Sequence, residues 1–173
     1  IGIVDYSYAF LNSKITSIPS GFPSGVVNTS NMFQGCSLLN ANISMDTSQV
    51  TDMSYMFQGC SALNGTITLS TSKVQNMQNM FQGCSSFNQT ISLSTSNVNN
   101  MSHMFQGCSS LNKTVTLNIS KVTDTSYMFQ GCTVFNQYIS LATGLVTNMT
   151  NMFEGCNAFN QPLSLDISSI PSG

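Results

Sequence analysis

Residues 50–60 read Val-Thr-Asp-Met-Ser-Tyr-Met-Phe-Gln-Gly-Cys, and close copies of this segment recur along the chain at intervals of 24 residues. The last five residues, Met-Phe-Gln-Gly-Cys, are found six times, and the only substitution is Glu154 in place of Gln. A fixed period of this size is typical of a solenoid, a stack of small units that bury their apolar sides against one another. We therefore expect six gapless repeats, called rungs from here on, over residues 26–169. They begin at residues 26, 50, 74, 98, 122 and 146.

The apolar residues of this segment have the spacing of a short helix. The two methionines, the phenylalanine and the cysteine of residues 50–60 lie at i, i+3, i+4 and i+7, which places them on one helical face. Asp52 precedes them, and every rung has Asn or Asp at this place, which are favoured N-cap residues. Gly59 is suited to a left-handed C-terminal stop. The pattern predicts a helix of about two turns in each rung.

The second half of each rung alternates between polar and apolar residues. In the second rung, Ile67 and Leu69 would face the core while Thr66 and Thr68 face solvent, as in a half-buried strand. Stacked rungs would place these strands side by side in a parallel sheet, about 4.8 Å apart. We therefore predict an α/β solenoid with one short parallel strand and one two-turn helix in each rung. The outward hydroxyl residues form a candidate contact face: Thr66, Thr68, Thr90, Ser92, Thr114 and Thr116.

The two ends of the chain depart from the repeat. Residues 1–25 follow it loosely, with Asn12 in the cysteine place, and we expect a degenerate N-terminal capping rung. The first residue is Ile1, which indicates a processed chain or a fragment. The seven residues 15–21 reappear almost unchanged at 167–173, so residues 170–173 are either a C-terminal tail or the start of a further block.

Two invariant columns predict ladders that run along the stack. The cysteines lie in the apolar stripe, and we interpret them as buried free thiols that pack as small hydrophobic groups. Disulfide pairing between adjacent rungs is the alternative, although side chains that point the same way are poorly placed for it. The asparagines would hydrogen-bond from rung to rung. The two columns are Cys36, Cys60, Cys84, Cys108, Cys132 and Cys156, and Asn40, Asn64, Asn88, Asn112, Asn136 and Asn160.

Composition argues against several classes of function. Only 6% of the residues are charged, with four lysines, no arginine and a net charge of −2, so the chain lacks the basic stripe of a nucleic-acid binder. No apolar run approaches the roughly 18 residues of a membrane span. His103 is the only histidine and is expected to face solvent. Without a catalytic constellation or a Cys-x-x-Cys or Cys–His cluster, we predict no enzymatic activity, cofactor or metal.

The segment at residues 50–60 and the run Phe-Asn-Gln-Thr-Ile-Ser-Leu-Ser-Thr-Ser at residues 87–96 resemble the repeats of BspA-like leucine-rich-repeat surface proteins. The closest variety is the mycoplasma-lipoprotein type, with a repeat of about 25 residues. The resemblance covers all six rungs and implies a right-handed, leucine-rich-repeat-like stack. It also implies a secreted or cell-surface protein used in adhesion or surface display. It carries over no binding residues.

Three interpretations of the function stay open. The first is a fibre subunit or adhesin stalk that joins end to end, because low charge removes repulsion and an open stack end can accept another copy. Its partners would be itself, other surface proteins or glycans. The second is ice binding through the outward hydroxyl columns, which are interrupted at Asn42, Tyr138 and Pro162. The third is carbohydrate binding, with Tyr55, Tyr127 and Tyr138 as stacking residues, although no carboxylate pair suggests glycoside hydrolysis.

Overall fold

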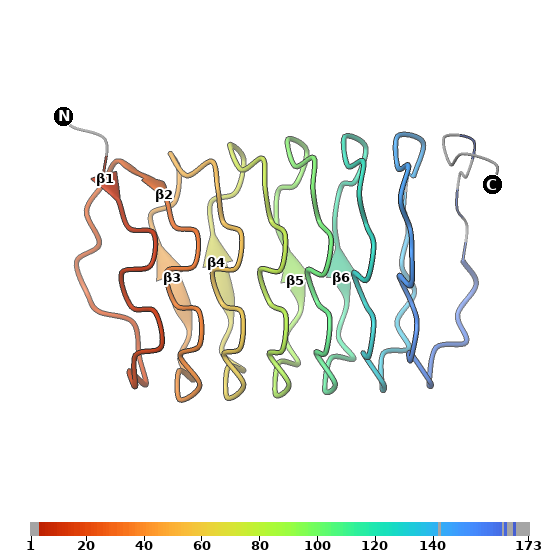
Figure 1. The fold of residues 1–173 in the computed structure, drawn as a ribbon, viewed down its shortest axis with the longest axis horizontal. Coiled ribbons are helices and arrows are strands. Elements are labelled where there is room, and N and C mark those ends of the chain that lie inside the picture. Colours follow the sequence, from red (N-terminus) through yellow and green to blue (C-terminus); the bar gives the residue numbers. More distant parts are fainter. Residues whose placement is uncertain (1–3, 142, 164, 166–167, 169–173) are drawn as a thin grey trace.

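The computed structural model describes residues 4–141, 143–163, 165 and 168, which wind into an elongated stack of rungs that follow one another in sequence order (Figure 1). Residues 170–173, for which a tail or a further block was predicted, lie outside this part. Six short strands are assigned: β1 (Val4–Asp5), β2 (Val26–Asn28), β3 (Ile43–Met45), β4 (Ile67–Leu69), β5 (Ile91–Ser92) and β6 (Val115–Thr116). None of the described residues lies in a helix that is long and apolar enough to cross a membrane.

The strands pair in parallel, and the pairs β3–β4 and β5–β6 have the register of the repeat, as predicted. In the pair β3–β4 Ile43 lies opposite Ile67, and in the pair β5–β6 Ile91 lies opposite Val115. Alternation along the strands is also confirmed, since Ile91 is buried while Ser92 is exposed. Strands β3 to β6 lie in one row along the stack (Figure 1). We call residues 66–71 and their equivalents in the other rungs the strand run.

The two-turn helix predicted in each rung is wrong, because this segment is a succession of tight turns. The N–H groups of Met56, Gln58 and Cys60 each donate to the carbonyl three residues earlier in the same rung. The N–H groups between them donate to the next rung instead, for example from Phe57 N to Met80 O at 2.9 Å. A backbone that sends alternate N–H groups to a neighbouring rung cannot form the i to i−4 bonds of an α-helix. We call residues 52–60 and their equivalents the turn run.

Two positive φ angles shape each turn run. Tyr55 has a φ of 59° and Gly59 a φ of 73°, and the same two places have positive φ in every rung. A positive φ at the third residue of a four-residue turn is what a type II turn requires, and it is incompatible with a right-handed helix. Side-chain capping by the Asn/Asp column is present, although it caps a turn. Asp52 Oδ1 accepts the Ser54 N–H at 2.8 Å.

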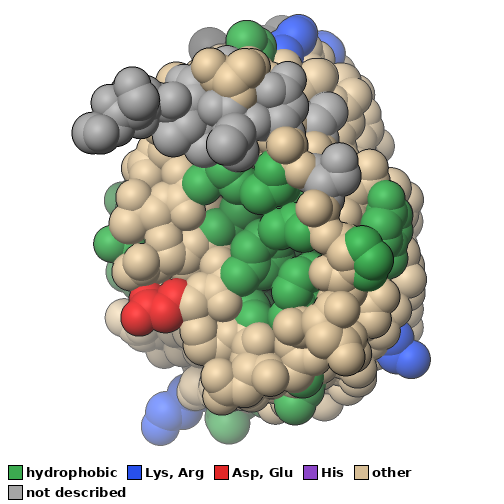
Figure 2. All heavy atoms as spheres, turned by 90° about the vertical axis from the view of Figure 1, so that its right-hand side faces the viewer, with side chains coloured by type: hydrophobic (Ala, Val, Ile, Leu, Met, Phe, Trp, Pro, Cys, Tyr) green, Lys and Arg blue, Asp and Glu red, His purple; other side chains and the backbone are tan. Residues whose placement is uncertain are grey.

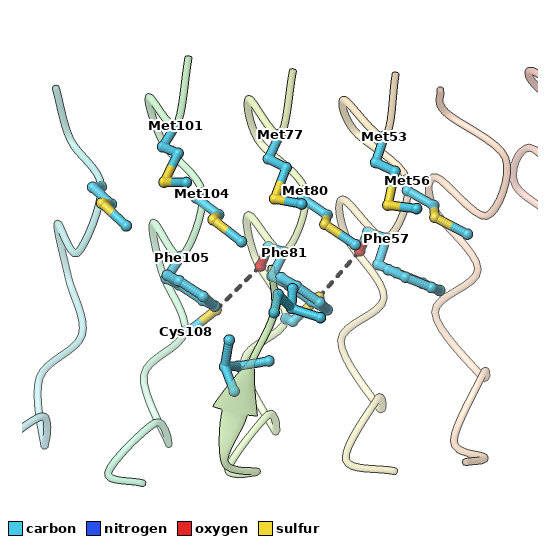
Figure 3. Packing of buried hydrophobic residues seen from close by; sticks show 14 of the residues in the cluster. Met53, Met56, Phe57, Met77, Met80, Phe81, Met101, Met104, Phe105 and Cys108 are labelled. Atoms are coloured by element: carbon cyan, nitrogen blue, oxygen red, sulfur yellow. Dashed lines mark hydrogen bonds between the residues drawn. The ribbon is translucent and has the colours of Figure 1, made fainter. Parts of the chain in front are cut away.

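The apolar stripe faces the core even though its backbone is not helical. Met53, Met56, Phe57 and Cys60 have no exposed surface, and their equivalents stack in columns along the molecule (Figure 3). The rings of Phe57 and Phe81 lie 5.5 Å apart between centroids, at an interplanar angle of 13°. Burial of each such side chain contributes about 1.5–3 kcal/mol, so this core is the main source of stability in stacked rungs.

Residues 4–13 follow the path of a turn run, but at an offset of 23 residues from the next rung. Tyr8 N donates to Ser30 O at 3.1 Å, and Asn12 N donates to Gln34 O at 2.7 Å. Asn12 has a φ of 55°, and it therefore takes the glycine place and not the cysteine place expected from the sequence. Ser13 stands where the other rungs have cysteine.

Candidate functional site

The cysteines are free thiols, buried in the core except for Cys156, which is half-buried. Each thiol donates to a phenylalanine carbonyl of the preceding rung, as Cys108 Sγ does to Phe81 O at 3.1 Å (Figure 3). Burial, and to a smaller extent the neighbouring Cys36, raises the pKa of Cys60 to about 12. Burial also raises the pKa of Cys108 well above its ordinary value. Because the thiolate is the nucleophile and the metal ligand, this column is chemically quiet at neutral pH.

The asparagine column forms a ladder in which one rung caps the next. Asn40 Oδ1 accepts the backbone N–H of Asn64 at 3.0 Å, and Asn64 Oδ1 accepts that of Asn88 at 2.9 Å. The series continues to Asn160, whose N–H donates to Asn136 Oδ1 at 3.0 Å. These side-chain oxygens are therefore engaged within the stack.

A glutamine ladder also runs along the turn runs, and the sequence analysis missed it. The side-chain amides of Gln34, Gln58, Gln82, Gln106 and Gln130 each donate to the side-chain oxygen of the next rung, and the last acceptor is the carboxylate of Glu154. A carboxylate only accepts, so Glu154 fixes the direction in which the whole ladder donates. The signal was visible as a column of Gln that ends in Glu.

His103 and two of the three candidate tyrosines are less accessible than predicted. His103 is half-buried, has a φ of 59°, and stacks on Tyr127 with ring centroids 4.6 Å apart. The expectation that His103 faces solvent is therefore wrong. Tyr55 and Tyr127 are likewise half-buried in this column, whereas Tyr138 is 61% exposed.

The six residues of the candidate contact face are all exposed on the outer side of the strand runs. The face is not one continuous sheet, because β4 and β5 belong to different two-stranded sheets. Within the described residues, no group of three or more His, Cys, Asp or Glu side chains is placed to hold a metal ion.

Two shallow grooves interrupt the sides of the stack. The first, of about 620 Å³, follows β6 and is lined by residues 114–120, Tyr138 and Ser140, and we call it the Tyr138 groove. It includes Thr114 and Thr116 of the candidate contact face. The second, of about 470 Å³, is polar and includes Lys73 and Lys121. Both ammonium groups already donate to neighbouring amide oxygens, those of Gln49 and Asn97.

At one end of the stack the core opens to solvent as an apolar patch (Figure 2). The last rung contributes half-buried side chains to this end patch: Met149, Phe153, Cys156, Phe159 and Leu165. The turn run of the same rung has four N–H groups without a partner in the described part of the chain, those of Met149, Asn151, Phe153 and Gly155. In every earlier rung the equivalent groups donate to the following rung.

The opposite end has the complementary set of backbone groups. In the later rungs, four carbonyls of each turn run accept the N–H groups of the preceding rung. The equivalent carbonyls of the first rung accept no backbone hydrogen bond from the described residues. They belong to Asp5, Ser7, Ala9 and Leu11. One end of the stack is thus a donor edge and the other an acceptor edge.

Two comparisons with known proteins agree with this architecture. Residues 5–116 and 111–170 match the family described as Mycoplasma protein of unknown function, DUF285. The chain belongs to this family. Its fold is similar to the crystal structure of a leucine-rich cell surface protein from Faecalibacterium prausnitzii, with 25% sequence identity and a TM-score of 0.59. The similarity covers 90% of this chain and 40% of that protein, so the chain spans about two fifths of its length.

The resemblance to BspA-like leucine-rich-repeat surface proteins is thereby confirmed, and the structural neighbour is a leucine-rich cell surface protein. The neighbour supports a leucine-rich-repeat type of stack, in which turns replace the helices predicted here. No curated protein matches the chain by sequence.

Proposed function

We propose that this chain is a non-enzymatic cell-surface interaction module that joins other copies end to end, as part of a fibre or an adhesin stalk. The proposal rests on the complementarity of the donor edge and the acceptor edge. Four N–H groups at one end and four carbonyls at the other have the spacing that joins every internal pair of rungs. A heterologous contact of this kind does not close on itself, so it extends into a filament.

The junction can be built by repeating the internal geometry. Phe153 N of one copy would donate to Ala9 O of the next, and the other three pairs would follow in register. The ring of Phe153 would meet Phe10 of the next copy, which already stacks on Phe33 within its own chain at 5.3 Å. Hydrogen bonds contribute only about 0.5–1.5 kcal/mol each, while association costs at least about 4 kcal/mol. Burial of the end patch therefore has to supply most of the affinity.

Charges do not oppose this junction. Glu154 would lie opposite the place of Leu11, which is apolar, and Asp5 would lie opposite that of Asn148, whose amide can donate to a carboxylate. Ser13, in the cysteine place, would bring a hydroxyl to the carbonyl that a thiol reaches elsewhere. With a net charge of −2, long-range repulsion between copies is also small.

The proposed location at the cell surface is supported by the structural neighbour. The structural neighbour is a leucine-rich cell surface protein, and the present chain shares its type of repeat. Ice binding has weaker support, because Tyr138 projects from the hydroxyl columns and the strand pairs form separate sheets. Absence of thermal hysteresis would remove that alternative.

Sedimentation velocity of the 173-residue chain over a wide concentration range tests the proposal. We expect linear oligomers that lengthen with concentration and appear as filaments by electron microscopy. Phe153→Asp places a charge in the end patch and should give monomers with unchanged circular dichroism. The matched control Thr68→Asp, on the exposed face of β4, should still assemble. A wild-type chain that stays monomeric throughout would overturn the proposal.

A further inference from the structure

The Tyr138 groove opens beside a rung that lacks a threonine hydroxyl. In the three preceding rungs this hydroxyl bonds one rung to the next. Thr47 Oγ1, Thr71 Oγ1 and Thr95 Oγ1 each donate to a carbonyl of the next rung, at 2.9, 2.8 and 2.8 Å. Ile119 stands at the equivalent place of the following rung and has no hydroxyl to donate. Its side chain is 1% exposed, so it packs in the core and leaves this link unmade. The strand pair β5–β6 ends shortly before this residue, at Ser92 and Thr116.

The residues across the groove differ from those of the other rungs in a way that favours a ligand. Tyr138 occupies the outward place that holds Thr66, Thr90 and Thr114 in earlier rungs. With 61% of its surface exposed, it presents an aromatic ring at the wall of the groove. Because most of this ring is exposed to solvent, packing in the core does not explain why tyrosine replaces threonine here.

The remaining lining is uncharged and mixes apolar side chains, those of Val115, Leu117 and Ile119, with polar ones. Hydroxyls come from Thr114, Thr116, Ser120 and Ser140, and an amide comes from Asn118. Asn118 Oδ1 accepts the Ser120 N–H at 3.0 Å, so the Nδ2 group is the part of this amide left to donate. Hydroxyls that both donate and accept, beside one aromatic face, match a ligand with an apolar ring face and several hydroxyl groups.

We propose that the Tyr138 groove binds a neutral carbohydrate, with one sugar ring stacked on Tyr138 and its hydroxyl groups bonded to the threonine, serine and asparagine side chains. The volume of about 620 Å³ lies within the range of small-molecule sites. No charged side chain lines the groove, which disfavours an anionic ligand.

An extended peptide fits the groove less well. Strand addition needs a row of free backbone N–H and C=O groups. Here the Asn118 N–H donates to Thr95 Oγ1 at 2.7 Å, and the Asn118 carbonyl accepts from the same hydroxyl. The backbone of Asn118 is therefore already engaged with the preceding rung and cannot pair with an added peptide strand.

The site lies in the side of the stack and is independent of end-to-end assembly. Binding can therefore be measured on Phe153→Asp, which the proposed function expects to be monomeric. Titration with maltose, cellobiose and lactose, followed by NMR of ¹⁵N-labelled protein, should shift resonances of residues 114–120 and 138–140. A glycan array then ranks neutral sugars against sialylated and sulfated ones.

Three variants test the roles of the residues. Tyr138→Thr installs the residue of the neighbouring rungs and should weaken binding about tenfold, whereas Tyr138→Phe keeps the ring and should change it by no more than about threefold. Ile119→Thr restores the missing hydroxyl and should also weaken binding, by closing the groove. Tyr8→Asn, at an exposed tyrosine far from the groove, is the matched control.

The inference is overturned if no neutral sugar binds, or if Tyr138→Thr binds sugar as tightly as the wild type does. It is also overturned if uncharged peptides shift the resonances of the groove and no sugar does. It is supported if sugar-induced shifts map to the groove, weaken in Tyr138→Thr and Ile119→Thr, and persist in Tyr138→Phe and Tyr8→Asn. Failure of filament formation would leave this result unaffected.

Discussion

The turn run and the strand run of each rung are stacked along the same molecule but are held together differently. In the turn runs every described rung is bonded to the next by the same backbone hydrogen bonds, and cysteine, glutamine and phenylalanine columns run alongside. In the strand runs the strands pair only two by two, β3 with β4 and β5 with β6, and threonine hydroxyls such as that of Thr71 supply the further links between rungs. The turn side is therefore the scaffold, and the strand side is where a rung can vary and open a groove.

The largest difference in the free energy of unfolding is expected between a substitution in the buried core of the turn runs and one on the exposed face of the strand runs. Phe105 lies between Phe81 and Phe129, at 5.6 and 5.5 Å, and has no exposed surface. Phe105→Ala should lower the free energy of unfolding by about 3–5 kcal/mol, because it leaves a cavity in the stack. Thr116→Ala, on the exposed side of β6, should change it by less than about 0.5 kcal/mol. Urea unfolding followed by circular dichroism measures both, and equal effects would contradict the division into scaffold and variable face.

The positive φ angles of the turn run should give the next largest effect. Gly107 has a φ of 73°, and a Cβ there would lie 3.7 Å from Gly83 Cα, so the added atom has room but the backbone is strained. Gly107→Ala should therefore cost about 1–2 kcal/mol. Thr114→Ala is the control on the strand side. A Gly107→Ala protein as stable as the wild type would mean that the turn runs tolerate another backbone path.

Alkaline pH should destabilise the thiol column. In the folded chain burial raises the pKa of Cys60 from 9.0 to about 12, while in the unfolded chain the thiol ionises near 9. Between these values the unfolded state loses its proton first, so the free energy of unfolding falls as pH rises from about 9 towards 12. Cys60→Ala should flatten this decline more than Cys156→Ala does, because Cys156 is only half-buried. An identical decline in both variants would contradict this account of the column.

The smallest effect concerns the direction of the glutamine ladder. Gln82→Glu removes the amide that donates to Gln106, and should cost about 0.5–1.5 kcal/mol. Glu154→Gln, at the exposed last place, should cost less because it retains an acceptor for Gln130. Thermal unfolding of the two variants provides the comparison. A gain in stability from Glu154→Gln would mean that the ladder runs in the opposite sense, because glutamine at this place could donate to Gln130 whereas a carboxylate cannot.

Much of this architecture could be predicted from the sequence. The 24-residue period sets the stacking, and the alternation around Ile67 and Ile91 sets the strands. The helix prediction failed because residues at i, i+3, i+4 and i+7 also converge when a run of tight turns is wrapped around a core. The column of Asn, Tyr and His at the first positive φ contained a clue, since Asn tolerates a left-handed backbone better than most residues.

The candidate surfaces were less accessible to sequence reasoning. The hydroxyl residues of the contact face were predicted by residue number and are all exposed. The Tyr138 groove depends on a hydroxyl that Ile119 lacks, and the role of that hydroxyl in the other rungs is visible only from its bond to the next carbonyl. The donor edge and the acceptor edge can be recognised only from the direction of the backbone hydrogen bonds between rungs. Composition and periodicity do not reveal that direction.

The central claim, that the two ends are complementary, is tested most directly by mixing two blocked variants. Phe10→Asp disables the acceptor end and Phe153→Asp the donor end, so each alone should sediment as a monomer. An equimolar mixture should give dimers and nothing longer, because one intact donor end meets one intact acceptor end. A mixture that stays monomeric, or either variant forming long oligomers alone, would contradict end-to-end assembly.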